Sequence, residues 1–528
     1  MSQNARIFTP IYTFAAVLLL SPLGLMAQDD EPTGVAKVQA KLALELGAPF
    51  CDQAVLQREI PVPVWGWSKP GTKITVEFAG QKKTTETGKD GKWMVKLDPL
   101  TASAEPRELK AGDVVIRDVL VGDVWLCSGQ SNMHFQMKSV AEAANEIEAA
   151  QDPDLRFFTV DHQFDRKPKD NVSGSWKPVS PGTAAGCSAV AYYFGRNLQQ
   201  KLKTPIGLVV SSVGGTRIET WMSAETLAST GESGPLVEKW KQISPQEFES
   251  IGKTYSEFQR QRDQLHPQAV RAAREKGEPF PPEPKAPRLR CHDCPSALHN
   301  GMIAPLQPFA IRGAIWYQGE SNSGQPGPYE KLLPAMIADW RKVWGDELPF
   351  LFVQLAPHRN THPAFREAQH RIWQKTPHTA MAVTTDVGDA ANIHPTRKRP
   401  VGERLALAAR ALSYGEKIGY SGPVFKNMKI INDRAVISFD HPGSGLMAKG
   451  GALKGFAIAG KDGRFVPATA VIEGSVVSVS SDKISKPAAV RYNWEMVPDG
   501  NLFNRDGLPA APFRTDAQKD QAPAPEAN

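Results

Sequence analysis

The sequence lacks the basic runs, apolar spans and metal-ligand motifs that mark nucleic-acid-binding, membrane-spanning and metal-binding proteins. Its 528 residues carry a net charge of only +6, and no basic run is interleaved with aromatic residues, so nucleic acid is not an expected partner. Beyond the N-terminus no window is long and apolar enough to span a bilayer, so no membrane span is expected after processing. No HExxH motif or complete set of zinc ligands occurs, so we expect neither a metal nor another cofactor.

Cysteine is scarce and odd in number. The five are Cys51, Cys127, Cys187, Cys291 and Cys294. One or two disulfides can form from them, and at least one thiol is left over unless it pairs between chains. The run Cys291-His-Asp-Cys294 resembles half of a zinc site, but no second Cys/His pair lies at structural-zinc spacing. The pattern favours a local disulfide or a purely structural role.

The N-terminus has the pattern of a secretory signal. Arg6 supplies a positive charge, Ile11–Leu20 is a short apolar core, and Ala27 is a small residue suited to cleavage. We therefore predict a signal peptide over residues 1–27 and a secreted or periplasmic protein. At the other end, residues 516–528 have the composition of a disordered tail.

Length and patterning divide the rest of the chain. A chain of this size is expected to form about three domains. Short alternating runs at 62–67, 73–78 and 92–97 predict an N-terminal β-sandwich domain over residues 28–116. Residues 117–420 alternate strand and helix, as in an α/β domain with a parallel sheet, and carry a charged, helical and proline-rich insertion at 225–298. Residues 421–515 are β-rich again. The first domain contains three tryptophans that could stack on sugars, Trp65, Trp67 and Trp93. Tryptophans in short strands more often fill cores.

The α/β region is organised around a serine in a sharp turn. Val119–Leu126 is apolar enough to be a buried strand, and the polar turn Ser128-Gly-Gln-Ser-Asn132 follows it. Gly129 permits backbone angles that other residues avoid, so the chain can reverse there. A strand, a sharp turn and a helix with a serine at the apex is how α/β hydrolases present a nucleophile, although the G-x-S-x-G form is absent.

Three further polar clusters follow predicted strands. The strand 205–212 leads to Gly214-Gly215, the strand 310–317 leads to Gln318-Gly-Glu-Ser-Asn-Ser323, and the strand 379–385 leads to Asp386, Asp389 and His394. The carboxyl ends of parallel strands share one edge of a sheet, where α/β proteins bind ligands. His394 lies in a loop before the next helix, where a catalytic base is expected.

Four ordered blocks make the chain similar to the sialate O-acetylesterase family of SGNH-type (GDSL-like) hydrolases. They are Gly129-Gln-Ser-Asn-Met133, Gly214-Gly-Thr216, Trp316-Tyr-Gln-Gly-Glu-Ser-Asn322 and Ile393-His-Pro395. The resemblance implies a three-layer catalytic domain and removal of O-acetyl groups from sugars or glycans by a serine esterase. Related acetylesterases act on plant polysaccharides such as xylan or xyloglucan, so that substrate class stays open. Esterases of other specificity and a non-catalytic carbohydrate-binding protein are further alternatives.

The resemblance also implies roles for individual residues. Ser131 would be the nucleophile and His394 the base. Oxyanion donors would be the backbone N–H groups of Ser131 and Gly215 and the side-chain amide of Gln318. Substrate contacts would come from three further residues, namely Arg217, Glu320 and Asn322.

The acid of the expected triad is ambiguous. Many SGNH enzymes have an aspartate three residues before the histidine, where this chain has Ala391. Asp386 and Asp389 are the candidates, and an imidazole held by a backbone carbonyl is the third reading. We favour Asp386, because the predicted strand Thr379–Thr385 would hold its backbone rigidly.

Overall fold

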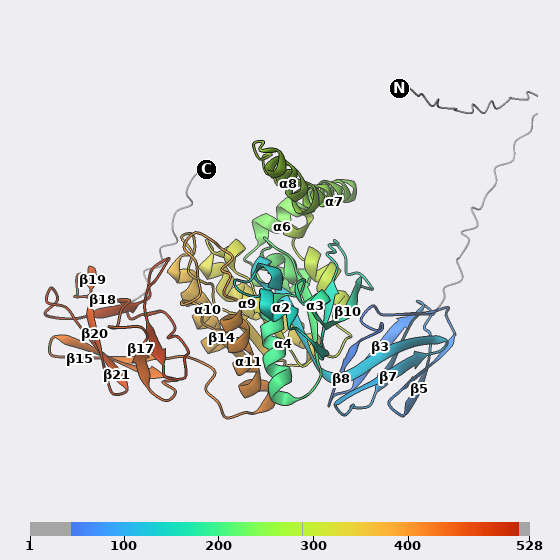
Figure 1. Ribbon diagram of the computed structural model, residues 1–528, viewed down its shortest axis with the longest axis horizontal. Helices are drawn as coiled ribbons and strands as arrows, with labels where there is room; N and C mark the ends of the chain where they lie inside the picture. The colour runs from blue at the N-terminus through green and yellow to red at the C-terminus, as the bar shows by residue number, and fades with distance from the viewer. Residues whose placement is uncertain (1–43, 288, 517–528) are drawn as a thin grey trace, which may run out of the picture. The chain divides into compact units, whose positions relative to one another are not determined.

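The computed structural model describes residues 44–287 and 289–516, which belong to one compact unit (Figure 1). The predicted signal peptide and all of the predicted tail except Asp516 lie outside these residues. Within them, the chain has a mixed α/β architecture with one large sheet and additional β-sheet regions.

The N-terminal region is β-rich, as predicted. Three strands form one antiparallel sheet, β1 (Glu45–Leu46), β3 (Val62–Trp67) and β6 (Lys92–Leu97). Other strands join the large sheet through the first half of β8 (Val114–Gly129), namely β2 (Val55–Gln57), β4 (Lys73–Phe78), β5 (Gln81–Glu86) and β7 (Ser103–Ala111). Trp65 and Trp93 are buried in the core, while Trp67 is half-buried. The predicted runs 62–67, 73–78 and 92–97 coincide with β3, β4 and β6, and burial alternates along β4 and β6.

The second half of β8 lies in the middle of the α/β sheet. The strand order is β10-β9-β11-β8-β12-β13-β14, and all neighbours are parallel except the edge strand β10. The strands that flank β8 are buried at every residue, which explains their continuous apolar sequences. The bounds are β9 (Asp152–Val160), β10 (Gly174–Val179), β11 (Ile206–Ser212), β12 (Gly313–Tyr317), β13 (Phe350–Val353) and β14 (Thr379–Ala382).

Helices cover this sheet in packed pairs. The helix α4 (Ala189–Leu202) packs on α11 (Arg399–Tyr414), and α9 (Pro326–Trp344) packs on α10 (Pro363–Lys375) (Figure 1). Apolar spacing in the sequence predicts helices over Ala189–Leu202, Tyr329–Val343 and Pro400–Leu412. The first matches α4 to the residue, and the other two match α9 and α11 to within three residues at each end. Short helices fill the connections, including α1 (Ser131–His134), α2 (Ala144–Glu148), α3 (Pro181–Ala184) and α5 (Ala224–Thr230).

The predicted insertion is helical. It contains α6 (Gly234–Lys241), α7 (Pro245–Arg260), a π-helical turn (Gln261–Leu265) and α8 (His266–Lys276). A capping box starts α7, since Ser244 Oγ accepts from the N–H of Glu247 at 3.2 Å and the Glu247 carboxylate accepts from the N–H of Ser244 at 2.8 Å. The helices α7 and α8 stand apart from the large sheet in Figure 1.

The C-terminal region has its own core. Two four-stranded antiparallel sheets surround it, in the orders β15-β16-β21-β20 and β19-β18-β22-β24. Their bounds are β15 (Val424–Ile431), β16 (Arg434–Asp440), β18 (Phe456–Ala459), β19 (Phe465–Pro467), β20 (Thr469–Glu473), β21 (Val476–Ser480), β22 (Ala489–Tyr492) and β24 (Phe513–Arg514). A separate pair joins β17 (Leu446–Ala448) to β23 (Leu502–Asn504). Arg514 on β24 donates to Glu367 on α10 at 3.0 Å, so the C-terminal region contacts the α/β region.

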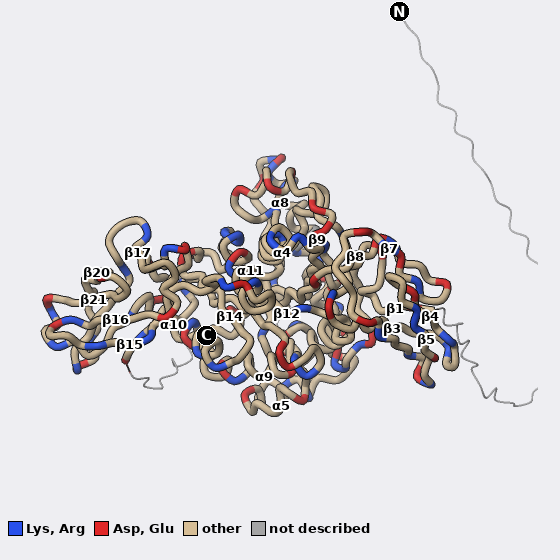
Figure 2. The backbone as a smooth tube through the Cα atoms, turned by 90° about the horizontal axis from the view of Figure 1, so that it is seen from below, with Lys and Arg blue, Asp and Glu red and all other residues tan. Residues whose placement is uncertain are grey.

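Charge is distributed without a long run of one sign. Figure 2 shows acidic and basic residues interspersed along the backbone, which agrees with the small net charge. Across residues 44–287 and 289–516, no helix has the length and apolar character needed to cross a membrane.

Candidate active site

The turn after β8 requires glycine. Gly129 has a φ of 134°, and a Cβ placed on it would lie 2.2 Å from the carbonyl oxygen of Tyr317 on the neighbouring strand. A residue with a side chain would therefore push β8 and β12 apart. The short helix α1 starts two residues later at Ser131, whose hydroxyl stands at the carboxyl edge of the sheet.

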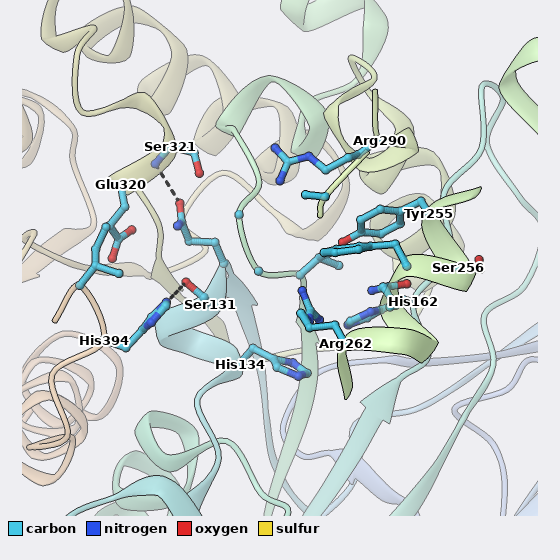
Figure 3. Close-up of a pocket in the computed structure, with 18 of the residues that line it drawn as sticks. Ser131, His134, His162, Tyr255, Ser256, Arg262, Arg290, Glu320, Ser321 and His394 are labelled. Carbon is cyan, nitrogen blue, oxygen red and sulfur yellow. Dashed lines mark hydrogen bonds between the residues drawn. The ribbon is translucent and has the colours of Figure 1, made fainter. Parts of the chain in front are cut away.

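Ser131 and His394 meet at this edge. The Ser131 Oγ atom lies 2.7 Å from His394 Nε2, although the two residues are 263 positions apart (Figure 3). The contact leaves Nδ1 as the protonated nitrogen when the imidazole is neutral and accepts from the hydroxyl. Burial, Lys398 and His358 lower the pKa of His394 from its ordinary value. The imidazole is therefore neutral near pH 7, the state that a general base needs.

Asp386 lies elsewhere than we predicted. The strand β14 ends at Ala382, so Asp386 lies in the turn beyond the strand rather than at its end. Both of its carboxylate oxygens accept from Arg404 on α11, each at 2.7 Å. No hydrogen bond joins it to His394 within the described part of the chain. Asp386 therefore forms an ion pair with Arg404 that links the turn to α11. Because Asp386 is not at the end of a strand, no strand holds its backbone as we expected.

Asp389 shapes the histidine loop through backbone contacts. Its Oδ1 atom accepts from the N–H groups of Ala391 at 2.8 Å and Asn392 at 3.1 Å. The Asn392 side chain in turn accepts from the N–H of His394 at 2.9 Å. This carboxylate therefore folds the loop that carries the imidazole instead of bonding to the ring.

A buried polar chain ties this loop to the nucleophile turn. Asn132, next to Ser131, donates through Nδ2 to Glu320 and, at 3.0 Å, to the carbonyl oxygen of Ile393. Its Oδ1 atom accepts from the ammonium group of Lys398. All three contacts use the amide of Asn132, so its orientation is fixed. The residue before His394 is thereby held to the residue after Ser131.

Lys398 was not anticipated from the sequence. Its side chain is fully buried, and its ammonium lies 4.8 Å from the ring centre of Phe135 and 5.3 Å from that of Tyr317. Burial lowers the pKa of Lys398 to about 7, while Glu320 opposes this shift. A lone lysine before a helix carries no distinctive pattern, so only the fold reveals it beside the site.

Glu320 lies at the cleft, as predicted, with part of its carboxyl group hidden from water. Its Oε2 atom is buried without a hydrogen-bond partner among the described residues, and burial raises the pKa of the carboxyl group. Asn132 and Lys398 act against this shift. Figure 3 shows Glu320 on the same side of the cleft as His394.

The other predicted contacts form a framework beneath the site. Gln318 is fully buried and donates to the carbonyl of Thr216 at 3.0 Å and to Asn322 at 2.8 Å, so both amide protons are used. Asn322 donates in turn to Glu219 at 2.9 Å. Arg217 pairs with the same Glu219 at 2.7 Å. These bonds use both amide protons of Gln318, and they tie Arg217 and Asn322 to Glu219.

The predicted backbone donors are better placed. Gly215 has a φ of 73° and lines the cleft with Ser131, and neither N–H donates to another described residue. Gln130 joins them, although the sequence analysis did not single it out. Its Oε1 atom accepts from the N–H groups of Gly319 and Ser321, each at 3.4 Å, which leaves its Nε2 as the remaining donor at the cleft.

The cleft around these groups holds about 840 Å³. One side carries Ser131, Glu320 and His394, and the other carries residues of the insertion (Figure 3). The volume falls in the range of about 300–1,000 Å³ that small-molecule sites occupy.

The Cys291–Cys294 segment lies within the insertion and forms no disulfide. All five thiols are free, and Cys291 donates to the carbonyl of Phe248 at 3.3 Å. Of the two readings we favoured, the structure therefore supports the purely structural one. In the part of the chain that the structure describes, no cluster of three or more His, Cys, Asp or Glu residues could hold a metal ion.

Comparison with known proteins agrees with the motifs. The family model described as a carbohydrate esterase, sialic acid-specific acetylesterase, matches residues 121–251 and 296–411. The chain is 33% identical over 436 residues to a sialate O-acetylesterase of Mus musculus, covering 73% of this chain and 77% of that protein. It is 30% identical over 436 residues to the sialate O-acetylesterase of Homo sapiens, covering 73% and 74%.

A solved structure resembles most of this chain. The crystal structure of a carbohydrate acetylesterase from Xanthomonas citri matches with a TM-score of 0.76 and 38% sequence identity. The match covers 90% of this chain and 100% of that one.

Proposed function

Because the chain belongs to the sialate O-acetylesterase family of carbohydrate esterases, it is a carboxylic ester hydrolase, and we propose that Ser131 and His394 carry its reaction. The observation that supports this most strongly is the 2.7 Å contact between Ser131 Oγ and His394 Nε2 at the cleft. A hydroxyl and a neutral imidazole at this distance form an activated nucleophile.

The reaction follows from that pair. As Ser131 Oγ bonds to the acetyl carbonyl carbon, His394 Nε2 takes the hydroxyl proton. The imidazolium then gives this proton to the leaving sugar oxygen as the ester bond breaks, which leaves an acetyl group on Ser131. A water molecule, deprotonated by His394 Nε2, then attacks the acetyl carbonyl carbon of the acetyl-enzyme. As the bond from that carbon to Ser131 Oγ breaks, the imidazolium returns the proton to Oγ, and acetate leaves.

Donors for the oxyanion come from the turn and its neighbours. The N–H groups of Ser131 and Gly215 and the Nε2 of Gln130 lie at the cleft without an acceptor among the described residues. Fixed donors of this kind stabilise the negative charge that develops on the carbonyl oxygen. Gln130 thus takes the role that the sequence analysis assigned to Gln318.

The imidazole is oriented by its loop in this proposal. Neither Asp386 nor Asp389 bonds to the ring, so we assign the orientation to the bond between Asn132 and the carbonyl of Ile393. The site then works as a serine–histidine dyad with a buried amide clamp in place of the usual triad aspartate.

The buried ammonium of Lys398 influences the pH dependence of this dyad through the pKa of His394. Lys398 is one of the groups that lower the pKa of His394, so its removal raises that pKa. Activity requires neutral His394 and falls as pH decreases through that pKa. We therefore expect Lys398→Met to move the acid limb of the kcat/KM profile to higher pH. The profile of an aryl acetate, measured from pH 4 to 9, checks this, and an unmoved or lowered limb contradicts it.

The substrate that the family supports best is an O-acetylated sugar. We propose acetylated sialic acids first, and acetylated plant polysaccharides of the xylan or xyloglucan type as the second candidate. The carbohydrate acetylesterase of 38% identity supports the wider class. The paired hydroxyl and imidazole argue against a non-catalytic binding protein.

Acetate release tests this directly. We expect the purified protein to release acetate from acetylated sialic acids, xylan or xyloglucan with a higher kcat/KM than from 4-nitrophenyl acetate. The preferred glycan identifies the substrate class. Turnover of the aryl ester alone, with no acetylated carbohydrate hydrolysed, would falsify the proposed function.

We also propose export, from the pattern of residues 1–27. Expression of the full chain in a Gram-negative host should yield a shortened protein in the periplasmic fraction. A full-length protein retained in the cytoplasm contradicts this proposal.

A further inference from the structure

One wall of the cleft lies outside the residue ranges that the family model matches. The model matches residues 121–251 and 296–411, and the residues between these ranges stay unmatched. That unmatched segment supplies several residues of the cleft wall, including Tyr255, Phe258, Arg262 and Arg290. Figure 3 shows Tyr255, Arg262 and Arg290 across the cleft from Glu320 and His394. The catalytic groups thus lie within the ranges that the family model matches, whereas the opposite wall lies between those ranges.

The helix α7 and the π-helical turn after it build most of this wall. Tyr255 and Phe258 are three residues apart on one face of α7, and Arg262 follows in the π-helical turn. Tyr255 is 4% exposed and packs edge-on to His292, with ring centres 4.5 Å apart, which anchors the face. Phe258 is half-buried, and the guanidinium of Arg262 lies 5.4 Å from its ring centre. The wall therefore presents an aromatic surface beside a guanidinium.

Arg290 brings a second guanidinium close to the reacting centre. Its Nε and Nη2 atoms donate to Asp293 at 2.7 and 3.0 Å, which holds the side chain in a bidentate pair. Its Nη1 atom has no partner among the described residues and lies 3.3 Å from the position that a Cβ on Gly215 would occupy. One fixed pair of donors thus faces the cleft beside a proposed oxyanion donor.

We propose that the unmatched segment forms a binding site for the sugar units attached to the acetylated sugar, so that the enzyme prefers acetylated oligosaccharides to acetylated monosaccharides. The inference rests on the proposed function and deepens it. Sugar rings offer C–H faces to aromatic side chains and hydroxyls to guanidinium donors, the two kinds of group that Phe258 and Arg290 present. A cleft of about 840 Å³ exceeds what an acetyl group requires and accommodates adjoining sugars.

Substrate length tests the site in the unaltered protein. Acetylated xylotetraose and O-acetylated sialyllactose are compared with acetylated xylose and O-acetylated sialic acid. We expect the longer member of at least one pair to have a kcat/KM at least tenfold higher, mainly through a lower KM. Equal values within both pairs overturn the inference, because the wall then contributes no binding.

Substitutions in the wall test which residues produce the preference for oligosaccharides. Phe258→Ala and Arg290→Lys should each lower kcat/KM for the preferred oligosaccharide at least tenfold more than for 4-nitrophenyl acetate. Arg290→Lys keeps the charge beside Asp293 but loses the planar fork. Lys253→Ala is the matched control, because this residue on α7 is 78% exposed and pairs with Glu249 away from the cleft lining. It should leave both activities unchanged.

The outcomes separate this inference from the function on which it rests. Equal losses on both substrates, or no loss on either, overturn the wall as a sugar-binding site while acetate release still supports the enzyme. An absence of carbohydrate turnover in the unaltered protein refutes the proposed function itself.

Discussion

Ser131→Ala is expected to lower kcat about a million-fold, since removal of a nucleophile that works with a paired base has an effect of this order. The hydroxyl lies 2.7 Å from His394 Nε2 and is half-buried at the cleft. The residual rate of the variant is measured by following the hydrolysis of an aryl acetate over hours. His394→Ala and the double variant should lose about as much as Ser131→Ala alone, because the two residues act as one unit.

Ser128→Ala is the matched control for this experiment. Ser128 is fully buried three residues earlier on β8, and its hydroxyl has no hydrogen-bond partner among the described residues. Loss of an unpartnered hydroxyl should cost little in activity or stability. Near-normal turnover in Ser131→Ala, with unchanged unfolding, would show that another group attacks the ester.

Asn132→Ala is expected to lower kcat about a hundredfold while KM changes little. The amide holds the carbonyl of Ile393 at 3.0 Å and also bonds to Glu320 and Lys398. Its loss frees the histidine loop, and a displacement of about 1 Å in a catalytic group can cost about a hundredfold. The measurement is kcat and KM on an aryl acetate, with the pH profile recorded to separate misplacement from a changed pKa.

Asp386→Asn provides the comparison, because it tests the aspartate that the sequence favoured. We expect kcat to fall less than tenfold, and the free energy of unfolding to fall by about 3 kcal/mol, as when one partner of a buried ion pair is removed. The partner is Arg404, which is 7% exposed. A thousandfold loss of kcat in Asp386→Asn, with little effect from Asn132→Ala, restores the aspartate as the orienting group and refutes the amide clamp.

Local sequence determined the elements and the edge at which the site forms. Strands such as β3 and helices such as α4 follow from apolar periodicity, which depends only on neighbouring residues. The polar blocks at Ser131, Gly215, Glu320 and His394 all follow strands of one parallel sheet, so their shared edge was predictable before the structure. The ends of strands were less predictable, as the early end of β14 at Ala382 shows.

The tertiary structure alone decided which partner each polar side chain takes. Asp386 bonds to Arg404, Gln318 to the carbonyl of Thr216, and Lys398 to Asn132, and in none of these pairs does the sequence separation identify the partner. A carboxylate or amide bonds to the donor that packing brings within about 3 Å, and that distance is set by how distant segments pack. Periodicity therefore identified the residues at the site, whereas the packing of α11 and the histidine loop assigned their roles.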